Sequence, residues 1–525
     1  MKTLLLLLTP ALLPGQVKVP FDRILNADKE PGNWLSYSRD YSGQRYSPLA
    51  QINAGNVAKL RVAWMTQADE MDTVQTSPIV VDGTMFITKP PNIVEALDAR
   101  TGRSVWTYRR DISSDVRGCC GKVNRGVAIL DDTIYYGSAD AHLVALDART
   151  GAVRWDVSMA DPKLGYSGTG APLALKDKII VGMAGGEFGV RGFIDAYDAK
   201  TGKRLWRFNT IPGKGEPGNE TWAGESWKTG SATTWVTGVY DADTNTLFWG
   251  TGNPGPDWNG DARLGDNLYS DSLLALDPDT GARKWHFQYT PHDVNDWDST
   301  QTPILADGMF QGQRRKMVVL ANRNGFYYSL DRETGKFIAG RPYIRQTWAK
   351  GLDEAGRPMR LPNTTPTFEG LLMWPSLGGG SNWYSSTFSP QTNYYYVNAK
   401  EQGAIYYKGA AEFKAGAFFD GGGQRPYKKE EPYGAVRALD VVTGELKWEY
   451  MLHSPSHAGL MTTAGGLVFG SNQSTFFALD AKSGALLWRF EAGGGIVANP
   501  ISYLVDGKQY VAIAAKHALL VFSLD

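Results

Sequence analysis

Cysteine is almost absent from this 525-residue chain, which contains only the adjacent pair Cys119 and Cys120. A covalently attached c-type haem is excluded, because no Cys-x-x-Cys-His segment exists. The chain also has no excess of positive or negative charge, since 54 Lys and Arg residues balance 54 Asp and Glu residues. No charge excess therefore favours nucleic acid or an anionic membrane as a partner. Helical periodicity is nearly absent, so a helical fold is not expected.

Long apolar runs are missing, apart from Leu4–Leu13 near the start of the chain. That run follows a single Lys2 and is shorter than the roughly 20 residues of a spanning helix. We predict that residues 1–16 are a cleaved signal peptide, with an uncleaved lipid-surface anchor as the alternative. We expect no transmembrane anchor. Export to the oxidising periplasm would follow.

A hairpin-like pattern recurs along the chain, with Asp and then Thr-Gly or Ser-Gly at constant offsets. Copies begin at Leu97, Leu146, Tyr197, Leu276, Leu330, Leu439 and Leu479. All but the Leu330 copy place a tryptophan eight residues after the Asp, at Trp106, Trp155, Trp206, Trp285, Trp448 and Trp488. An apolar-Asp pair ends a strand, Asp and Gly form a tight turn, and the tryptophan anchors the next strand.

The spacing of these hairpins predicts the fold class. Copies about 40 to 55 residues apart fit four-stranded blades arranged radially. The segment that ends at Trp64 looks like the outer strand of one more unit, so the chain has eight units in all. We predict that the run Gln509–Leu524 is a strand that joins the N-terminal blade. The prediction is an all-β, eight-bladed β-propeller closed by N- and C-terminal strands, with residues 17–525 as a single domain.

Three insertions interrupt the repeat, at residues 209–235, 341–381 and 400–434. They are rich in Gly, Pro and Trp and too long for hairpin turns. Long loops on a rigid scaffold often build binding surface, so we expect a ligand site there.

The two cysteines lie in the phrase Gly118-Cys119-Cys120-Gly121. In an exported protein such a pair can bond to itself or remain as two thiols. An oxidising compartment favours the disulfide, although a trans peptide holds the two Cα atoms only about 3.8 Å apart. Both states stay open on this evidence.

Acidic and amide side chains cluster in three other phrases. Glu187 lies in Ala184–Gly189, Asn253 lies in Gly250–Pro256, and Asp296 lies in His292–Asp298. Their oxygens could form a site for a hard cation. Asp and Asn are also ordinary turn residues, so a purely structural role is the alternative.

With these phrases in order, the sequence resembles the methanol/ethanol-type dehydrogenases that carry pyrroloquinoline quinone (PQQ). The resemblance runs from Asn33-Trp34 through Arg45-Tyr-Ser-Pro-Leu49 and Asn56-Val57 to the last strand. That family folds as an eight-bladed propeller, which agrees with the unit count.

The resemblance implies a set of site residues. It implies that a Cys119–Cys120 disulfide covers one face of the quinone and Trp235 the other, with Asp296 as general base and Arg323 beside the reactive carbonyl. The implied cofactor contacts are Gln75, Cys119, Cys120, Arg125, Thr169, Gly185, Gly186, Thr233, Trp235, Arg323 and Asn382. The implied metal ligands are Glu187, Asn253, Asp296 and Asp298.

Some positions depart from the family pattern. Asp298 is typical of members that resemble lanthanide-dependent enzymes, because an added carboxylate suits a trivalent ion. Asn295 stands where many members have Trp, so calcium stays open as the cation. Gln75 replaces a common Glu. His457 replaces a common Trp, and it is either a substrate contact or a structural histidine.

The resemblance thus implies an exported PQQ- and metal-dependent dehydrogenase that oxidises a primary alcohol to an aldehyde. Electrons would pass to a separate cytochrome c or a similar carrier. A polyol or sugar dehydrogenase and a non-enzymatic envelope scaffold are the alternatives, because a fold does not determine a function. The oligomeric state stays open, with a homodimer as one alternative.

Overall fold

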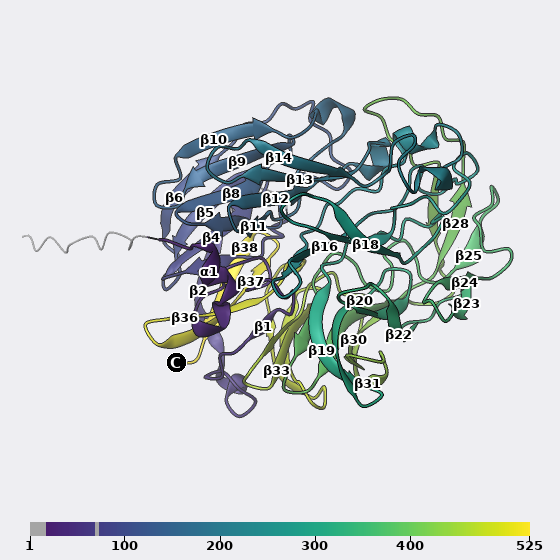
Figure 1. Ribbon diagram of the computed structural model, residues 1–525. Coiled ribbons are helices and arrows are strands. Elements are labelled where there is room, and N and C mark those ends of the chain that lie inside the picture. Colours follow the sequence, from purple (N-terminus) through teal and green to yellow (C-terminus); the bar gives the residue numbers. More distant parts are fainter. Residues whose placement is uncertain (1–16, 69–72) are drawn as a thin grey trace, which may run out of the picture.

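The structure is a computed structural model that describes residues 17–68 and 73–525, and these residues form an all-β protein (Figure 1). The helical elements are α1 (Phe21–Leu25), η1 (Ala27–Lys29), η2 (Val57–Lys59), η3 (Pro162–Leu164), η4 (Gly186–Phe188), η5 (Asn219–Thr221) and η6 (Ser226–Thr229). In the described segments, no helix has the length and apolar character needed to cross a bilayer. The predicted signal peptide, residues 1–16, lies outside the described residues.

Most strands belong to seven sheets of four strands and one sheet of five within the described chain. The first four sheets hold β3 (Ile79–Val81), β4 (Thr84–Lys89), β5 (Ile93–Asp98) and β6 (Ser104–Arg109); β7 (Ala128–Leu130), β8 (Thr133–Gly137), β9 (His142–Asp147) and β10 (Val153–Ser158); β11 (Leu173–Leu175), β12 (Lys178–Gly182), β13 (Phe193–Asp198) and β14 (Arg204–Asn209); β15 (Val239–Asp241), β16 (Thr246–Gly250), β17 (Ser272–Leu276) and β18 (Arg283–Gln288). The other four hold β19 (Ile304–Phe310), β20 (Gln313–Ala321), β21 (Phe326–Asp331) and β22 (Phe337–Pro342); β26 (Thr387–Ser389), β27 (Tyr394–Glu401), β30 (Tyr433–Asp440) and β31 (Leu446–Leu452); β1 (Tyr46–Ser47), β32 (Met461–Thr463), β33 (Leu467–Asn472), β34 (Thr475–Asp480) and β35 (Leu486–Glu491); β2 (Arg61–Gln67), β36 (Ile501–Val505), β37 (Lys508–Ala515) and β38 (Ala518–Ser523).

The recurring pattern forms the hairpin that the sequence predicts, as β9 and β10 show. The Asp147 carboxylate accepts hydrogen bonds from the backbone N–H of Thr150 at 2.9 Å and from its hydroxyl at 2.9 Å. Gly151 follows with φ of +73°, a conformation that glycine adopts without strain. The Asp and Gly of each copy therefore reverse the chain between two antiparallel strands.

The repeat tryptophans join one sheet to the next. Trp155 on β10 donates from its indole nitrogen to the carbonyl of Ala199, 3.1 Å away in the following hairpin. A Cβ at Gly202 would lie 2.9 Å from the Trp155 ring, so the turn glycine also makes room for the neighbouring indole. Equivalent bonds run from Trp64 to Ala99, Trp106 to Ala148, Trp206 to Pro278, Trp448 to Ala481 and Trp488 to Leu60.

The copy without a tryptophan uses a different aromatic residue. The Tyr327 hydroxyl donates to the carbonyl of Val441 at 2.6 Å. A Cβ at Gly444 would lie 2.5 Å from the Tyr327 ring. A tyrosine one strand earlier in the hairpin thus fills the space that tryptophan fills in the other copies.

The two ends of the chain meet in one sheet, where β2 pairs antiparallel with β38. In Figure 1 the yellow C-terminal strands lie beside the purple N-terminal segment. The prediction of one strand over Gln509–Leu524 was wrong in detail, because β37 and β38 form a hairpin there. Lys516, with φ of +52°, lies at its turn.

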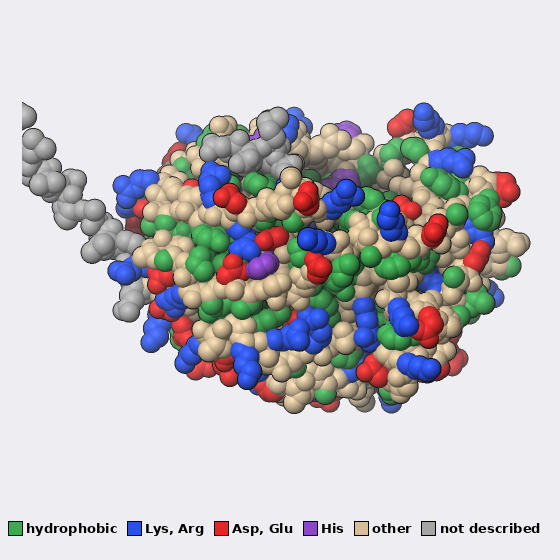
Figure 2. All heavy atoms as spheres, turned by 90° about the horizontal axis from the view of Figure 1, so that it is seen from above, with side chains coloured by type: hydrophobic (Ala, Val, Ile, Leu, Met, Phe, Trp, Pro, Cys, Tyr) green, Lys and Arg blue, Asp and Glu red, His purple; other side chains and the backbone are tan. Residues whose placement is uncertain are grey.

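The insertions carry small sheets of their own. They contain β23 (Ala349–Leu352) with β24 (Pro358–Arg360), and β25 (Leu371–Met373) with β28 (Ala404–Lys408) and β29 (Gly422–Pro426). These sheets lie together at one edge of the molecule in Figure 1. Figure 2 shows acidic and basic side chains interspersed over the face that it presents, in keeping with the balanced composition.

Candidate functional site

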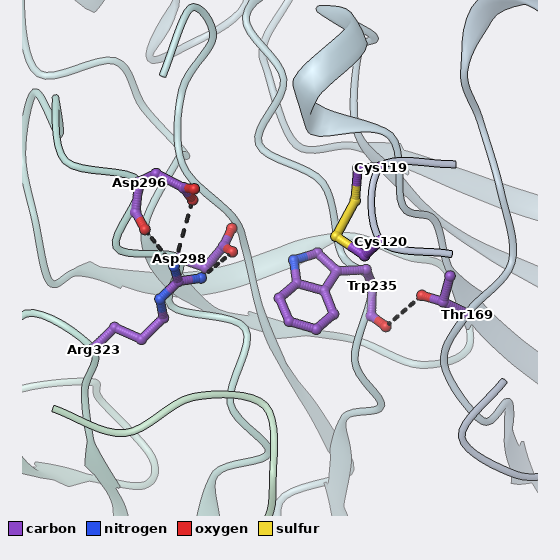
Figure 3. The surroundings of a disulfide bond; sticks show 7 residues. All are labelled: Cys119, Cys120, Thr169, Trp235, Asp296, Asp298 and Arg323. Carbon is purple, nitrogen blue, oxygen red and sulfur yellow. Dashed lines mark hydrogen bonds and ion pairs between the residues drawn. A yellow bond between two sulfur atoms is a disulfide. The ribbon is translucent and has the colours of Figure 1, made fainter. Parts of the chain in front are cut away.

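A cavity of about 360 Å³ is lined by every site residue that the sequence analysis proposed. They come from separate sheets and insertions, and some are drawn in Figure 3. The lining includes Gln75, Cys119, Cys120, Arg125, Thr169, Gly185, Gly186, Glu187, Thr233, Trp235, Asn253, Asp296, Asp298, Arg323 and Asn382. Residues up to about 300 positions apart in sequence therefore face one space.

Two flat, rigid groups contribute to this cavity. Cys119 and Cys120 form a disulfide with their Cα atoms 3.8 Å apart, so the disulfide prediction is confirmed over the two-thiol alternative. Trp235 lies outside the repeat pattern, and its backbone carbonyl accepts a hydrogen bond from the Thr169 hydroxyl at 3.3 Å. Figure 3 shows the Trp235 indole and the disulfide at the same region of the site.

Arg125 is a buried cation whose hydrogen-bonding capacity is not fully used within the described residues. Its Nε and Nη1 atoms have no partner there. The guanidinium lies 4.3 Å from the ring of Trp383 and 5.0 Å from the ring of Trp235. Burial lowers the pKa of Arg125 to about 10. Buried donors without acceptors are costly, so this end of the cavity is suited to an anionic ligand.

Gln75 adds an unpaired acceptor to the cavity, because its side-chain oxygen is buried and has no partner among the described residues. Nearby polar backbone comes from Gly185, which has φ of +125°. A side chain there would be strained and would collide with the carbonyl of Gly165. The glycine thus keeps the backbone open to a ligand.

Oxygen donors gather at another part of the lining. Glu187 lies on η4, and burial raises its pKa to about 7. The Asn253 amide nitrogen donates to Asp257 at 2.7 Å, which holds the amide in one orientation. Burial and then the Glu187 charge raise the pKa of Asp257 well above its usual range. A cluster of buried carboxylates with few counter-charges fits a bound cation.

Arg323 ties two aspartates of the third phrase together. Its Nη1 donates to the Asp298 carboxylate at 2.5 Å, and its Nη2 donates to the backbone carbonyl of Asp296 at 2.5 Å (Figure 3). The Asp296 carboxylate lies 3.6 Å from the same Nη2. Asp298 also accepts from the backbone N–H of Asn253 at 3.1 Å.

Asp296 has two unusual properties. Its φ is +56°, which is uncommon for a residue other than glycine and is often found at functional sites. Burial raises its pKa well above the usual range, and the carboxylate of Asp298 adds to this while Arg323 opposes it. A carboxylate of raised pKa is a stronger base than an ordinary one, which suits a proton acceptor.

The disulfide sulfurs and a Glu187 oxygen lie within 4.8 Å of one another. Bonded sulfurs are not thiolates, and the thiolate is the metal ligand, so this trio is not a thiolate metal site. The proximity instead shows that the disulfide and the oxygen donors border the same space.

The sequence analysis missed Trp383, which lines the cavity, and Asp257, which lies behind the lining. Trp383 stacks on Arg125, and Asp257 orients Asn253. Trp383 directly follows the predicted Asn382, and Asp257 lies four residues after the predicted Asn253; this proximity in sequence was the only signal available. His457 is not part of the lining; it contacts Lys400 and the Tyr384 ring.

A largely all-β scaffold with a disulfide, an indole, unpaired buried donors and a carboxylate cluster around one cavity defines the quinone-carrying class of dehydrogenases. The profile described as "PQQ: Glucose/ethanol/alcohol dehydrogenase, beta-propeller domain" matches residues 34–341 and 451–511. The chain belongs to this family of PQQ-dependent alcohol dehydrogenases, which confirms the resemblance seen in the sequence.

Characterised relatives are similar along nearly the whole chain. Quinoprotein alcohol dehydrogenase PedH of Pseudomonas putida is 39% identical, over 97% of this chain and 91% of that protein. The lanthanide-dependent methanol dehydrogenase of Methylacidiphilum fumariolicum is 38% identical, over 94% of this chain and 86% of that protein. The quinohemoprotein alcohol dehydrogenase structure from Comamonas testosteroni aligns with a TM-score of 0.92 at 35% identity, covering 98% of this chain and 83% of that one. The structure of a europium-containing methanol dehydrogenase aligns with a TM-score of 0.91 at 34% identity, covering 96% of this chain and 100% of that one.

Proposed function

We propose that this protein uses PQQ and one cation to oxidise a primary alcohol to an aldehyde. The observation that carries the proposal is the convergence of three features on one cavity. They are the unpaired donors of Arg125, the pair formed by the disulfide and Trp235, and the oxygen donors around Asp296. Electrons would then leave to a separate cytochrome c or a similar carrier.

The chain offers suitable contacts for the cofactor. PQQ carries carboxylates, and Arg125 with Thr169, Thr233 and Gln75 can bind them at the rim. The Cys119–Cys120 disulfide and the Trp235 indole would cover its two faces, while Gly185, Gly186 and Asn382 would complete the pocket. When bound, the quinone supplies the hydride acceptor and the cation supplies Lewis-acid polarisation of its carbonyl.

Four oxygen-bearing residues would hold the cation, namely Glu187, Asn253, Asp296 and Asp298. We favour a lanthanide over calcium because the fourth residue is a carboxylate and the surrounding ones are buried. The similarity to a lanthanide-dependent methanol dehydrogenase supports this choice. Calcium remains the alternative.

Asp296 would act as the general base that takes the hydroxyl proton of the alcohol. Arg323 would hold it in place, because the guanidinium donates to the Asp296 carbonyl and also to the carbonyl of Leu377 at 2.7 Å. Arg323 is thus anchored at two backbone carbonyls, one of them that of Asp296, and would keep the base directed at the cavity.

We extend the proposal to the whole molecule. The eight larger sheets would be the eight blades of one closed ring, spanning residues 17–525 as a single domain. A cleaved signal over residues 1–16 would direct the protein to the periplasm. A homodimer is compatible with these features.

The test is reconstitution of the purified protein with PQQ and either lanthanum or calcium, followed by dye reduction with a panel of alcohols. Quinone absorbance in the loaded protein and turnover of primary alcohols are expected. Turnover of polyols or sugars in place of simple alcohols would favour the second enzymatic reading. Absence of both absorbance and turnover with either cation would favour an envelope scaffold instead.

A further inference from the structure

Lys400 is a buried lysine without an acidic partner. It lies near the end of β27 and only 2% of its surface is exposed. Its Nζ lies 3.4 Å from the Nδ1 atom of His457 and 5.0 Å from the centre of the Tyr384 ring. Within the described residues no carboxylate forms an ion pair with it, and the adjacent Glu401 is bound to Arg437 at 2.7 Å. A buried charge without compensation is costly, so the position calls for a function.

The amine lies directly behind the cavity wall. Gly378 lines the cavity, and a Cβ placed on it would lie 3.4 Å from Lys400 Nζ. The neighbouring carbonyl of Leu377 accepts from Arg323, so the lysine is at the Arg323 end of the cavity. Glycine is the residue that leaves the least material between the amine and the ligand space.

Two other polar side chains lie around the amine, and the His457 Nδ1 atom accepts a hydrogen bond from the charged lysine. The Tyr384 hydroxyl is buried and has no partner among the described residues. His457 is exposed on one side, and its ring meets that of Tyr384 edge-on with centres 6.2 Å apart. These three residues, the Lys400 cluster, therefore offer one cation and unused donors near the cavity.

We propose that the Lys400 cluster selects alcohols that carry a carboxylate, such as short ω-hydroxy acids, over uncharged alcohols of the same length. The hydroxyl would face Asp296 while the carboxylate faces the Lys400 side and balances its charge. The reaction would be unchanged: the carbon of the hydroxymethyl group would give up a hydride to the quinone, its hydroxyl would give up a proton to Asp296, and the carboxylate would not be altered. This inference rests on the proposed function.

The proposal has a pH signature. Burial, and then the charge of Arg323, lower the pKa of Lys400 to about 7. Partial burial of its ring and the Lys400 charge lower the pKa of His457 to about 4, so that ring is neutral near neutrality. The other facing groups are Arg323 and Tyr384. As pH rises through about 7 the lysine loses its charge, so KM for a hydroxy acid should rise while KM for an uncharged alcohol should not follow it.

The experiment compares 3-hydroxypropanoate with 1-propanol on the PQQ- and lanthanum-loaded full chain. Lys400→Met keeps the length and removes the charge, and Lys400→Arg keeps the charge. We expect the Met variant to lower the ratio of kcat/KM for hydroxy acid over propanol by about 10- to 100-fold, which is the usual weight of a hydrogen bond to a charged group. The Arg variant should restore most of this ratio.

Lys178→Met is the matched control, because Lys178 is also largely buried but pairs with Asp177 and Asp279 away from the cavity. It should leave the ratio unchanged. An unaltered ratio in Lys400→Met, with propanol still oxidised, overturns the inference and leaves the proposed function standing. If that variant does not fold, a wild-type KM for hydroxy acid that does not respond to pH overturns it equally. Failure of the wild type to oxidise either substrate would instead sink the proposed function.

Discussion

Asp298 links the two halves of the proposed cation site, since it accepts from the backbone of Asn253 and from Arg323. We expect Asp298→Ala to abolish turnover with lanthanum and to spare turnover with calcium, because the lost carboxylate matters most to a trivalent ion. Steady-state rates of the PQQ-loaded variant with each cation measure this. Equal losses with both cations would contradict the lanthanide assignment.

Asp257 does not need to touch the cation to affect it. It fixes the Asn253 amide, so Asp257→Ala should weaken cation binding by about 10- to 100-fold. The variant also removes one of several crowded buried carboxylates, so the metal-free protein should be at least as stable as the wild type. Terbium luminescence titration and thermal unfolding check the two outcomes. Unchanged terbium affinity would show that Asn253 does not depend on this contact.

At the scale of single elements, each repeat tryptophan is the contact between a hairpin and the next sheet. We expect Trp155→Ala to lower the free energy of unfolding by about 3 kcal/mol, because it leaves a cavity over Gly202. Trp155→Phe keeps a ring but loses the bond to Ala199. It should lower the free energy of unfolding by less than Trp155→Ala, and the lost hydrogen bond should account for about 1 kcal/mol of that decrease. Urea unfolding of both variants gives the comparison. Similar costs would mean that the hydrogen bond, and not the packing, dominates.

Strand β18 carries a histidine that resists protonation. Burial and then the charge of Arg283 lower the pKa of His286 to about 4, against about 6.5 in an unfolded chain. The unfolded state therefore binds the proton first, and stability falls as pH drops from about 6.5 to 4. With allowance for partial exposure, we expect a loss of about 2 kcal/mol from this residue. Urea unfolding at about pH 7 and about pH 4.5 should show a smaller acid loss in His286→Gln; an identical loss would assign the effect to other groups.

For the molecule as a whole, β38 joins the two ends of the chain, because it lies between β2 and β37. Leu520→Pro would remove a ladder hydrogen bond inside that sheet and separate the two ends of the chain. We expect loss of cooperative unfolding and aggregation. The control Leu486→Pro changes β35, an edge strand, and should be milder. Calorimetry and size-exclusion chromatography compare the two variants. Equal loss of cooperative unfolding in both would argue against a special role for the sheet that joins the two ends of the chain.

Much of the fold could be predicted because each hairpin is a local unit. Asp147 and Gly151 act on residues a few positions away, so their effect is written in a short stretch of sequence. The substitution of Tyr327 for a tryptophan could not be predicted. It depends on which ring reaches Gly444 across two sheets, and that is a property of packing.

The candidate site divides in the same way. Residue types and family motifs are enough to identify Glu187, Asn253 and Asp296 in the linear sequence. Asp257 and Trp383 emerged only from contacts, because nothing in their local sequence states which side chain they support.

What the sequence determined by itself is the repeating hairpin, the family and a set of candidate site residues, since local turn chemistry and motif order are properties of the linear chain. Only the tertiary structure decided which donors remain without partners, how Arg323 divides its bonds between two aspartates, and that Lys400 lies buried behind Gly378. Those facts arise from segments far apart in the chain meeting at one cavity, where burial removes water and makes every unpaired charge significant.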